Sequence, residues 1–251
     1  HKVLDILYMI KNYDIDIFCI TETWLTNDIM NAELLFNGFK IFRLDREYSK
    51  GGGVLILTKN CFSSTLENSL CTKSSEILHI SIDFRSYKTI NLVCLYRPPS
   101  SDINSFSQEL SHLLNNIDYS QCPLILLGDF NHNLLNVKIK QDSLLQTLQS
   151  YGISPINKDI TRYSSSTSGS VIDWIAPNIL ATSKISEVMT NFSGCSDHLL
   201  VSFVYKKKRL IKKTVYNKVF IHDPVSIDKF LTLANFNIPF CDLENFLNCV
   251  N

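Results

Sequence analysis

The sequence predicts an α/β domain, a four-layer sandwich of two packed mixed β-sheets flanked by helices. Short apolar segments alternate with helical patterns, and loops rich in Ser, Asn, Gly and Pro separate them. The first predicted strands follow one another closely enough to pair as antiparallel neighbours, which favours packed sheets over a doubly wound parallel sheet. With 251 residues, 45% of them hydrophobic, the chain can bury a substantial core.

The predicted elements begin with a helix over 3–13, where apolar residues recur at helical spacing, and the short apolar strand "DIFCIT" follows. Further strands are predicted over 40–44, 53–58, 76–84, 89–96, 123–128, 170–175 and 199–205, and further helices over 103–117 and 141–151. The glycine run in "SKGGGV" precedes a strand and lacks the Lys-Ser/Thr pair of a phosphate-binding loop, so we expect a flexible turn. We expect Trp24 and Trp174 in the core.

Two regions are predicted, a domain over 1–205 and a basic linker and tail over 206–251. The segment "KKKRLIKK" holds six basic residues in eight positions, and the rest of the tail has only a weak amphipathic pattern. Such a run is usually a solvated flank. A contact to a phosphate backbone and a nuclear import signal are the alternatives.

Composition restricts the class of protein. The 24 basic and 24 acidic residues balance, so a nucleic-acid partner would have to bind a local patch. No apolar stretch approaches the roughly 18 residues that span a membrane and no leader opens the chain, which predicts a soluble protein without a membrane partner. The eight cysteines show no CxxC pairing and most lie in apolar runs, which predicts reduced core residues of an intracellular protein.

Carboxylate, amide, hydroxyl and imidazole side chains gather at the ends of predicted strands. They are Glu22, Tyr96, Asp129, Asn131, Asp173, Asp197 and His198. Such strand ends converge on one edge of a layered domain, where oxygen ligands and one His can hold Mg²⁺, or Mn²⁺ on the same ligands. Because Mg²⁺ keeps positions open for a phosphate oxygen and water, the pattern predicts phosphoester hydrolysis.

Five segments together resemble the endonuclease/exonuclease/phosphatase superfamily, and within it the endonuclease domains of non-LTR (LINE-type) retrotransposons. They are "CITETWL" (19–25), "LYRPPSS" (95–101), "LLGDFN" (126–131), "SVIDWI" (170–175) and "SDHLLVSF" (196–203), in the family's order. The segments "GDFN" and "SDH" mark the superfamily, whereas "TETWL" and "YRPP" favour the retroelement branch. The resemblance covers about residues 3–205.

The resemblance implies roles at the metal and the phosphate. Glu22 would be the chief Mg²⁺ ligand, and Asp197 would sit near the metal. Asp129 and Asn131 would position the water or leaving group and the phosphate. Tyr96 would donate to the scissile phosphate, although it could also be a strand aromatic whose hydroxyl only reaches water.

The resemblance also implies a role for the imidazole and for one hydroxyl. Asp173 would orient His198 by a hydrogen bond, and His198 would contact the phosphate as acid/base or transition-state stabiliser. An Asp between Ile172 and Trp174 is costly in a strand unless it is paired, which agrees with this partner. Thr161 matches a hydroxyl position that contacts the DNA backbone in relatives.

Several of these residues have simpler explanations. Glu22 could be a solvated strand-end carboxylate or a helix cap, and His198 could be a satisfied core histidine. Asp129 and Asn131 could form an Asx-turn, which is how such residues usually end strands. The segment from Arg97 through two prolines could simply stop its strand.

One departure from the family pattern concerns its first strand, which carries a catalytic Asn in a motif of the type N-x-R-S. This strand is expected just upstream of "HKVLDIL". Either the sequence is a fragment, or the product lacks a site residue and a central strand, which would leave an unpaired edge inside a sheet.

The leading hypothesis is therefore a Mg²⁺-dependent endonuclease that nicks DNA and leaves a 3′-hydroxyl, which in relatives primes reverse transcription. The expected partners are DNA and a reverse transcriptase domain in a longer polyprotein, with the nucleus as the place of action. The alternatives are a phosphatase or abasic-site nuclease on the same fold, and a catalytically dead relic that only binds nucleic acid.

Overall fold

The computed structural model describes residues 2–84, 89–137, 141–164 and 167–206. The chain divides into two units, His1–Lys208 and Arg209–Asn251, of which the second lies outside the described residues. The predicted linker and tail therefore lies outside them as well, apart from Lys206. Among the helices that the structure describes, none is long and apolar enough to cross a membrane.

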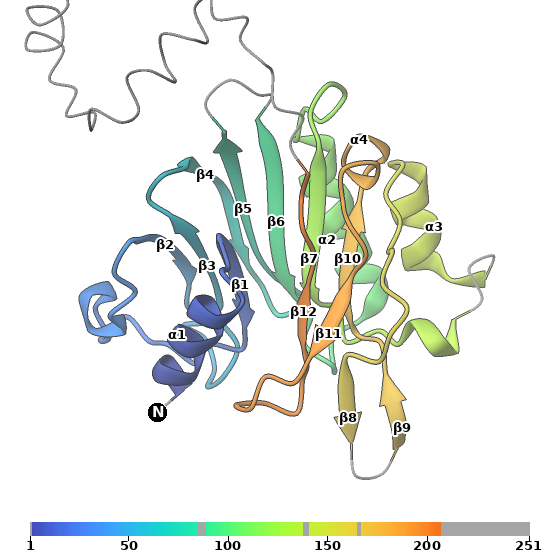
Figure 1. Cartoon of the computed structure of the whole chain (residues 1–251). Helices are drawn as coiled ribbons and strands as arrows, with labels where there is room; N and C mark the ends of the chain where they lie inside the picture. The colour runs from blue at the N-terminus through green and yellow to red at the C-terminus, as the bar shows by residue number, and fades with distance from the viewer. Residues whose placement is uncertain (1, 85–88, 138–140, 165–166, 207–251) are drawn as a thin grey trace, which may run out of the picture. The chain divides into compact units, whose positions relative to one another are not determined.

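The first sheet has three antiparallel strands in the order β1-β3-β2 (Figure 1). Its strands are β1 (Ile17–Thr21), β2 (Phe39–Leu44) and β3 (Val54–Lys59). Side chains alternate across β3, so Leu55 and Leu57 pack in one core cluster with helix α1 (Lys2–Asn12), while Val54 and Ile56 belong to the cluster between the sheets.

The second sheet has five strands in the order β10-β7-β6-β5-β4, in which β6 and β7 run parallel and the other neighbours antiparallel. Its strands are β4 (Ser63–Cys71), β5 (Glu76–Asp83), β6 (Ile90–Tyr96), β7 (Leu124–Asp129) and β10 (Asp173–Pro177). Helix α2 (Ile103–Asn115) connects the two parallel strands and packs with α3 (Ser143–Ser150) against this sheet. Both helices begin at an Asp that accepts a backbone N–H of the first turn, Asp102 and Asp142.

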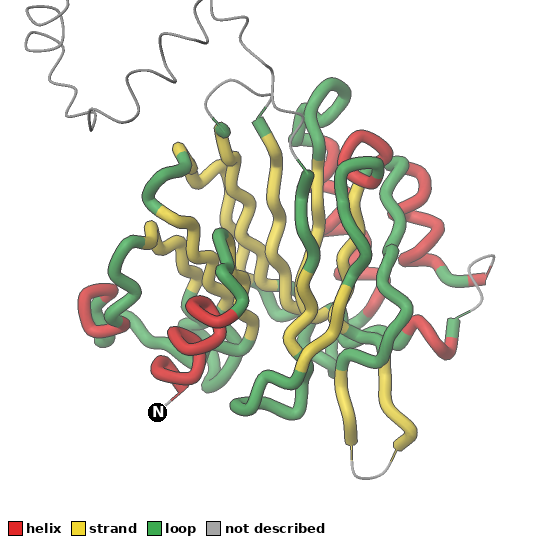
Figure 2. Tube along the Cα trace, viewed as in Figure 1, coloured by secondary structure: helices red, strands yellow, loops and turns green. Residues whose placement is uncertain are grey.

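The two sheets pack face to face and each carries helices on its outer side (Figures 1 and 2). Phe42 and Ile56 of the first sheet share a core cluster with Ile80 and Leu92 of the second. This order of helix, sheet, sheet and helix confirms the predicted four-layer sandwich. The first sheet differs from the prediction in being purely antiparallel among the described residues, because β1 and β2 both pair with the central β3 in antiparallel register.

Several short elements were not predicted. They are β8 (Arg162–Ser164), β9 (Thr167–Ser170), β11 (Met189–Asn191), α4 (Ile179–Thr182) and the 3₁₀ turns Asn31–Leu34 and Leu134–Asn136. Strand β4 also escaped prediction, because its polar sequence lies mostly exposed at the edge of its sheet. The strand predicted over 170–175 begins only at Asp173, since the two preceding residues bond to the loop after β7, and β12 (Leu200–Ser202) is shorter than predicted.

Strands β1 and β12 each lie at the edge of a sheet and have a single strand partner among the described residues. Strand β1 pairs with β3, and β12 pairs with β11. The edge of β1 that faces away from β3 therefore has no strand neighbour in the part of the chain that the structure describes.

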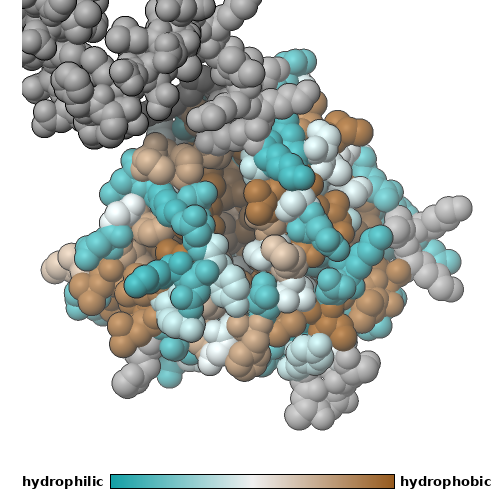
Figure 3. All heavy atoms as spheres, in the orientation of Figure 1, coloured by the Kyte–Doolittle hydropathy of each residue, from teal (hydrophilic) through white to brown (hydrophobic). Residues whose placement is uncertain are grey.

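In the orientation of Figure 1, Figure 3 shows hydrophobic residues around a hollow near the middle of the molecule.

The two tryptophans have opposite environments. Trp174 is buried and stacks on Phe130 with ring centroids 4.2 Å apart, as predicted. Trp24 is 56% exposed, so its predicted core position was wrong. It lies beyond the end of β1 in a loop with a φ of 56°, where side chains no longer alternate between the two faces of a strand.

The described cysteines are all free. Cys94 is buried beside Cys19, which agrees with the expected reduced core residues, but Cys61 is exposed.

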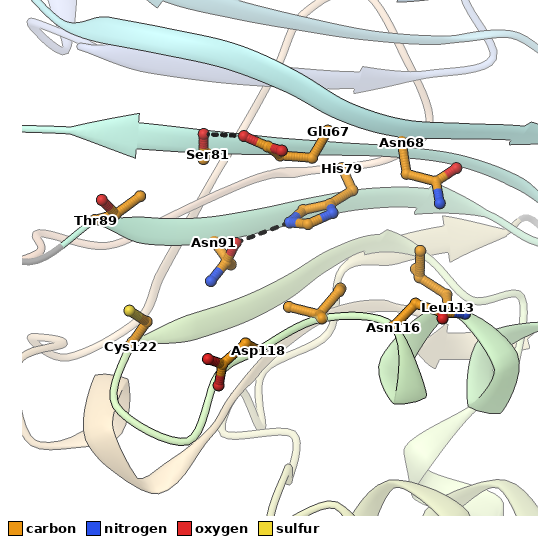
Figure 4. A pocket seen from close by; sticks show the side chains of 11 residues that line it. Glu67, Asn68, His79, Ser81, Thr89, Asn91, Leu113, Asn116, Asp118 and Cys122 are labelled. Atoms are coloured by element: carbon orange, nitrogen blue, oxygen red, sulfur yellow. Dashed lines mark hydrogen bonds between the residues drawn. The ribbon is translucent and has the colours of Figure 1, made fainter.

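A polar cavity of about 450 Å³ lies between β4, β5, β6 and the C-terminal end of α2 (Figure 4). The nearly buried His79 lines it, and its Nε2 atom lies 2.9 Å from Asn91 Oδ1. Burial lowers the pKa of His79, although the Asn91 contact and the charge of Glu67 oppose this shift. The folded protein therefore holds His79 neutral near pH 7.

We expect acidification from pH 7 to pH 5 to destabilise the fold through His79. Because its folded pKa lies below its ordinary 6.5, its contribution is fully present above pH 6.5 and is lost as pH falls through the folded pKa. The variant His79→Gln should lose less free energy of unfolding over this interval, as measured by urea denaturation. His112→Gln, on the exposed side of α2, is the matched control, and an equal pH dependence in both variants would contradict the prediction.

Candidate active site

The ends of three strands of the second sheet bring the core of the predicted site together. Tyr96 ends β6 and Asp129 ends β7, and the two are paired in the parallel register. Asp173 begins β10 directly opposite Asp129 in the antiparallel register. The sheet itself therefore places these three residues side by side, as expected for polar residues that follow adjacent buried strands.

His198 reaches this edge from the segment before β12. Its Nδ1 atom lies 3.0 and 2.9 Å from the two carboxylate oxygens of Asp173, the hydrogen bond that the sequence predicted. One ligand atom each from Asp129, Asp173 and His198 lies within 4.8 Å of the others. Burial opposes a charge on His198, but the hydrogen bond and charge of Asp173 outweigh it and raise the pKa of His198.

Asp129 carries the strongest electrostatic perturbation of the three. Asp129 is 3% exposed, and burial together with the charge of Asp173 raises the pKa of its carboxyl to about 7. The charge of Glu22 acts in the same direction, whereas His198 opposes it. The carboxylates are therefore close enough to repel one another, a condition that a cation would relieve.

Glu22 and Tyr96 form the second half of the site. The Tyr96 hydroxyl donates to Glu22 Oε1 at 2.5 Å, joining the first sheet to the second. Burial and this neighbouring carboxylate raise the pKa of Tyr96, so its hydroxyl keeps its proton. Glu22 lies beyond the end of β1 with a φ of 53°, an uncommon conformation for a residue with a side chain.

Asp129 and Asn131 do form the Asx-turn that was the simpler explanation for them. The Asn131 backbone N–H donates to Asp129 Oδ1 at 2.8 Å, and its Nδ2 atom donates to Asp129 Oδ2 at 3.1 Å. The turn and a place in the site are compatible, because these bonds orient the Asp129 carboxylate next to Asp173 and His198.

Arg97 was not predicted to contribute to the site. It is 6% exposed, and its guanidinium donates to the carbonyls of Phe130, Asn131 and Ser101 at 2.7 to 2.8 Å. Arg97 directly follows the end of β6, and its hydrogen bonds hold the turn after β7 in place. The signal in the sequence was an arginine that directly follows an apolar strand, since a buried charge needs partners.

Replacing Arg97 by Met should lower the free energy of unfolding by about 3 kcal/mol, because buried carbonyls lose their donors. We also expect the turn that carries Asp129 to loosen. Urea denaturation measures the first effect, and amide exchange of residues 130 and 131 measures the second. A stable variant with unchanged exchange would contradict this function of Arg97.

Thr161 does not lie where the resemblance placed it. It is fully buried, and its hydroxyl oxygen accepts the backbone N–H groups of Ile172 and Asp173 at 3.1 Å each. In this structure it cannot contact a DNA backbone. Its hydroxyl instead fixes the start of β10, from which Asp173 projects.

Asp197 also has a different environment from the one expected. Its side chain is 54% exposed and accepts from Arg162 Nε at 2.7 Å. It is not among the clustered ligand atoms of the described residues. Asp197 lies in a bend before β12, where its carboxylate is paired with Arg162.

The fold and this group of side chains together define a phosphoester hydrolase built as an α/β sandwich. A sequence model of the Endonuclease/Exonuclease/phosphatase family matches residues 1–198, and the chain belongs to this family. Its enzymes hydrolyse phosphoester bonds and depend on a divalent metal. No curated protein matches the sequence.

Three solved structures illustrate the shared fold. The endonuclease domain of TRAS1, a telomere-specific non-LTR retrotransposon, is 16% identical with a TM-score of 0.67, over 83% of this chain and 94% of that chain. An AP endonuclease from Archaeoglobus fulgidus is 15% identical with a TM-score of 0.62, over 81% and 93%. The 3′ phosphatase NExo from Neisseria, bound to a product DNA hairpin, is 13% identical with a TM-score of 0.63, over 82% and 95%. At these identities the likeness establishes the fold.

Proposed function

We propose that this protein is a Mg²⁺-dependent DNA endonuclease that nicks one strand and leaves a 3′-hydroxyl. The observation that carries the proposal is the Asp173–His198 hydrogen bond beside the buried Asp129 carboxylate. The DNA substrate is supported by the similar solved structures, which include a retrotransposon endonuclease domain and an AP endonuclease. A reverse transcriptase partner and action in the nucleus belong to the same proposal.

The side chains present fit a hard divalent cation. Asp129 and Asp173 supply carboxylate oxygen atoms within one small region, and burial together with the charge of Asp173 raises the pKa of Asp129. Glu22 remains the proposed chief ligand, and its charge acts on the buried carboxyl of Asp129. A bound Mg²⁺ would neutralise phosphate charge and make a water more acidic, and Mn²⁺ accepts the same ligands.

The chain's own residues suit the other needs of hydrolysis. Asp129 is placed to take a proton from the attacking water as its oxygen bonds to phosphorus. The bond from phosphorus to the 3′-oxygen breaks, the phosphate stays on the 5′ side of the nick, and the 3′-oxygen takes a proton from solvent water to become the hydroxyl. His198, with Nδ1 held by Asp173, and the protonated Tyr96 hydroxyl are donors for the charged oxygens of the transition state.

The test is nicking of supercoiled plasmid with Mg²⁺, with Mn²⁺ and with EDTA, followed by extension of the nick with a DNA polymerase. Metal-dependent nicks that the polymerase extends directly support the proposal. Parallel duplexes with one abasic site or one 3′-phosphate distinguish the other activities of the family. Incision at the abasic site or removal of the 3′-phosphate, without plasmid nicking, would assign one of those activities in place of the proposed one. Activity on none of the three substrates would indicate a catalytically dead relic.

A further inference from the structure

We propose that a buried ion pair between Glu76 and Arg46 positions both Glu22 and Tyr96, an inference that rests on the proposed function of that site. Glu76 is fully buried at the start of β5, where a carboxylate is costly unless it is paired. Its Oε1 atom accepts from Arg46 Nε, and its Oε2 atom accepts from the backbone N–H of Gly53 at 2.5 Å. Both carboxylate oxygens of Glu76 therefore accept hydrogen bonds from other parts of the protein.

The first connection runs through Arg46 to Tyr96. Glu76 and Tyr96 are paired residues of β5 and β6. The guanidinium carbon of Arg46 lies 5.7 Å from the ring centroid of Tyr96 and 5.5 Å from that of Tyr48, within cation–π range of both rings. Because the Tyr96 hydroxyl donates to Glu22, fixing this ring also fixes the direction from which Glu22 is held.

The second connection runs through the glycine turn to the backbone at Glu22. While Glu76 holds the Gly53 N–H, the carbonyls of Gly53 and Gly52 accept the N–H groups of the two residues after Glu22, at 3.2 and 2.8 Å. These bonds support the positive φ of Glu22, a conformation that persists only where its surroundings determine it. The Glu76 carboxylate thus supports Tyr96 through Arg46 and the backbone after Glu22 through the glycine turn.

The glycine turn is close-packed around this arrangement. A Cβ atom on Gly52 would lie 2.4 Å from the Arg46 guanidinium, and one on Gly53 would lie 2.3 Å from Thr23 Oγ1. Arg46 Nη2 is buried without a hydrogen-bond partner among the described residues. Glu76 is therefore the main compensation for the buried charge of Arg46, and a side chain at Gly52 or Gly53 would collide with Arg46 or Thr23.

Amide exchange in EDTA tests the inference without relying on catalysis. In Glu76→Gln, we expect the amides of residues 23 and 24 to exchange at least about tenfold faster, with the amides in the middle of β5 and β6 unchanged. Glu67→Gln, the same change at an exposed position of β4, should leave residues 23 and 24 as in the wild type. Unchanged exchange at residues 23 and 24 in Glu76→Gln would overturn the proposal.

A double variant separates positioning from folding. Glu76→Gln alone leaves the buried charge of Arg46 without a partner and should lower the thermal midpoint of unfolding. Glu76→Gln with Arg46→Met removes both charges and should restore the midpoint towards the wild-type value. We expect both variants to need about ten- to a hundredfold more Mg²⁺ for half-maximal nicking, with a smaller fall in kcat. If the Mg²⁺ requirement of the double variant recovers together with its thermal midpoint, the pair is merely structural and the proposal fails.

The two proposals fail in different ways. If the wild-type protein nicks no DNA, the proposed function is wrong, and the exchange experiment still decides whether Glu76 holds the backbone after Glu22. If the wild type nicks normally and Glu76→Gln matches it in both exchange and Mg²⁺ requirement, only the inference about the ion pair is wrong.

Discussion

His198→Ala should reduce the rate of Mg²⁺-dependent nicking by about a thousandfold. The imidazole is the only titratable ring in the described cluster, and Asp173 fixes its Nδ1 atom so that Nε2 is left for the substrate. Alanine removes that donor and leaves the Asp173 carboxylate without its partner. The initial rate of plasmid nicking at saturating Mg²⁺ measures the effect.

His112→Ala is the control, because it changes the same residue type on the exposed side of α2. It should nick at the wild-type rate. DNA binding in EDTA, measured by fluorescence anisotropy, should be similar in both variants. The fall in the nicking rate of His198→Ala would then arise in the chemical step and not in DNA binding. A His198→Ala protein that is folded and nicks within tenfold of the wild type would remove His198 from the mechanism.

Asp129→Asn should abolish nicking while making the metal-free protein more stable at pH 8, by about 2 kcal/mol. The amide keeps the shape of the Asx-turn but cannot ionise, so it removes the charge that burial and Asp173 oppose. It also cannot accept a proton from water. Function and stability should therefore change in opposite directions at this one position.

The stability gain should depend on pH with a definite sign. The carboxyl of Asp129 has a folded pKa of about 7 against an ordinary 3.8, so its contribution to stability is fully present below pH 3.8 and is lost as pH rises through 7. The advantage of Asp129→Asn should thus be small at pH 4 and largest at pH 8, as measured by urea denaturation in EDTA. An equal difference at both pH values would show that the charge of Asp129 is not its cause.

Much of the fold could be predicted because it depends on local apolar pattern. Strands β6 and β7 are nearly continuous apolar runs and β5 is rich in isoleucine and leucine, and such segments are buried wherever they pair. Strand β4 and the β8–β9 hairpin could not be predicted in this way, because their polar sequences become strands only through the neighbours that they meet.

The amino-acid sequence by itself determined the layered architecture and which strand ends carry polar residues, since period and residue type are local properties of a chain. It also indicated that Asp173 needed a partner. Only the tertiary structure decided that Thr161 is buried, that Asp197 faces Arg162, and that Glu76 compensates Arg46. These outcomes depend on register and direction between segments far apart in the chain, where a shift of one residue reverses the side to which a side chain points.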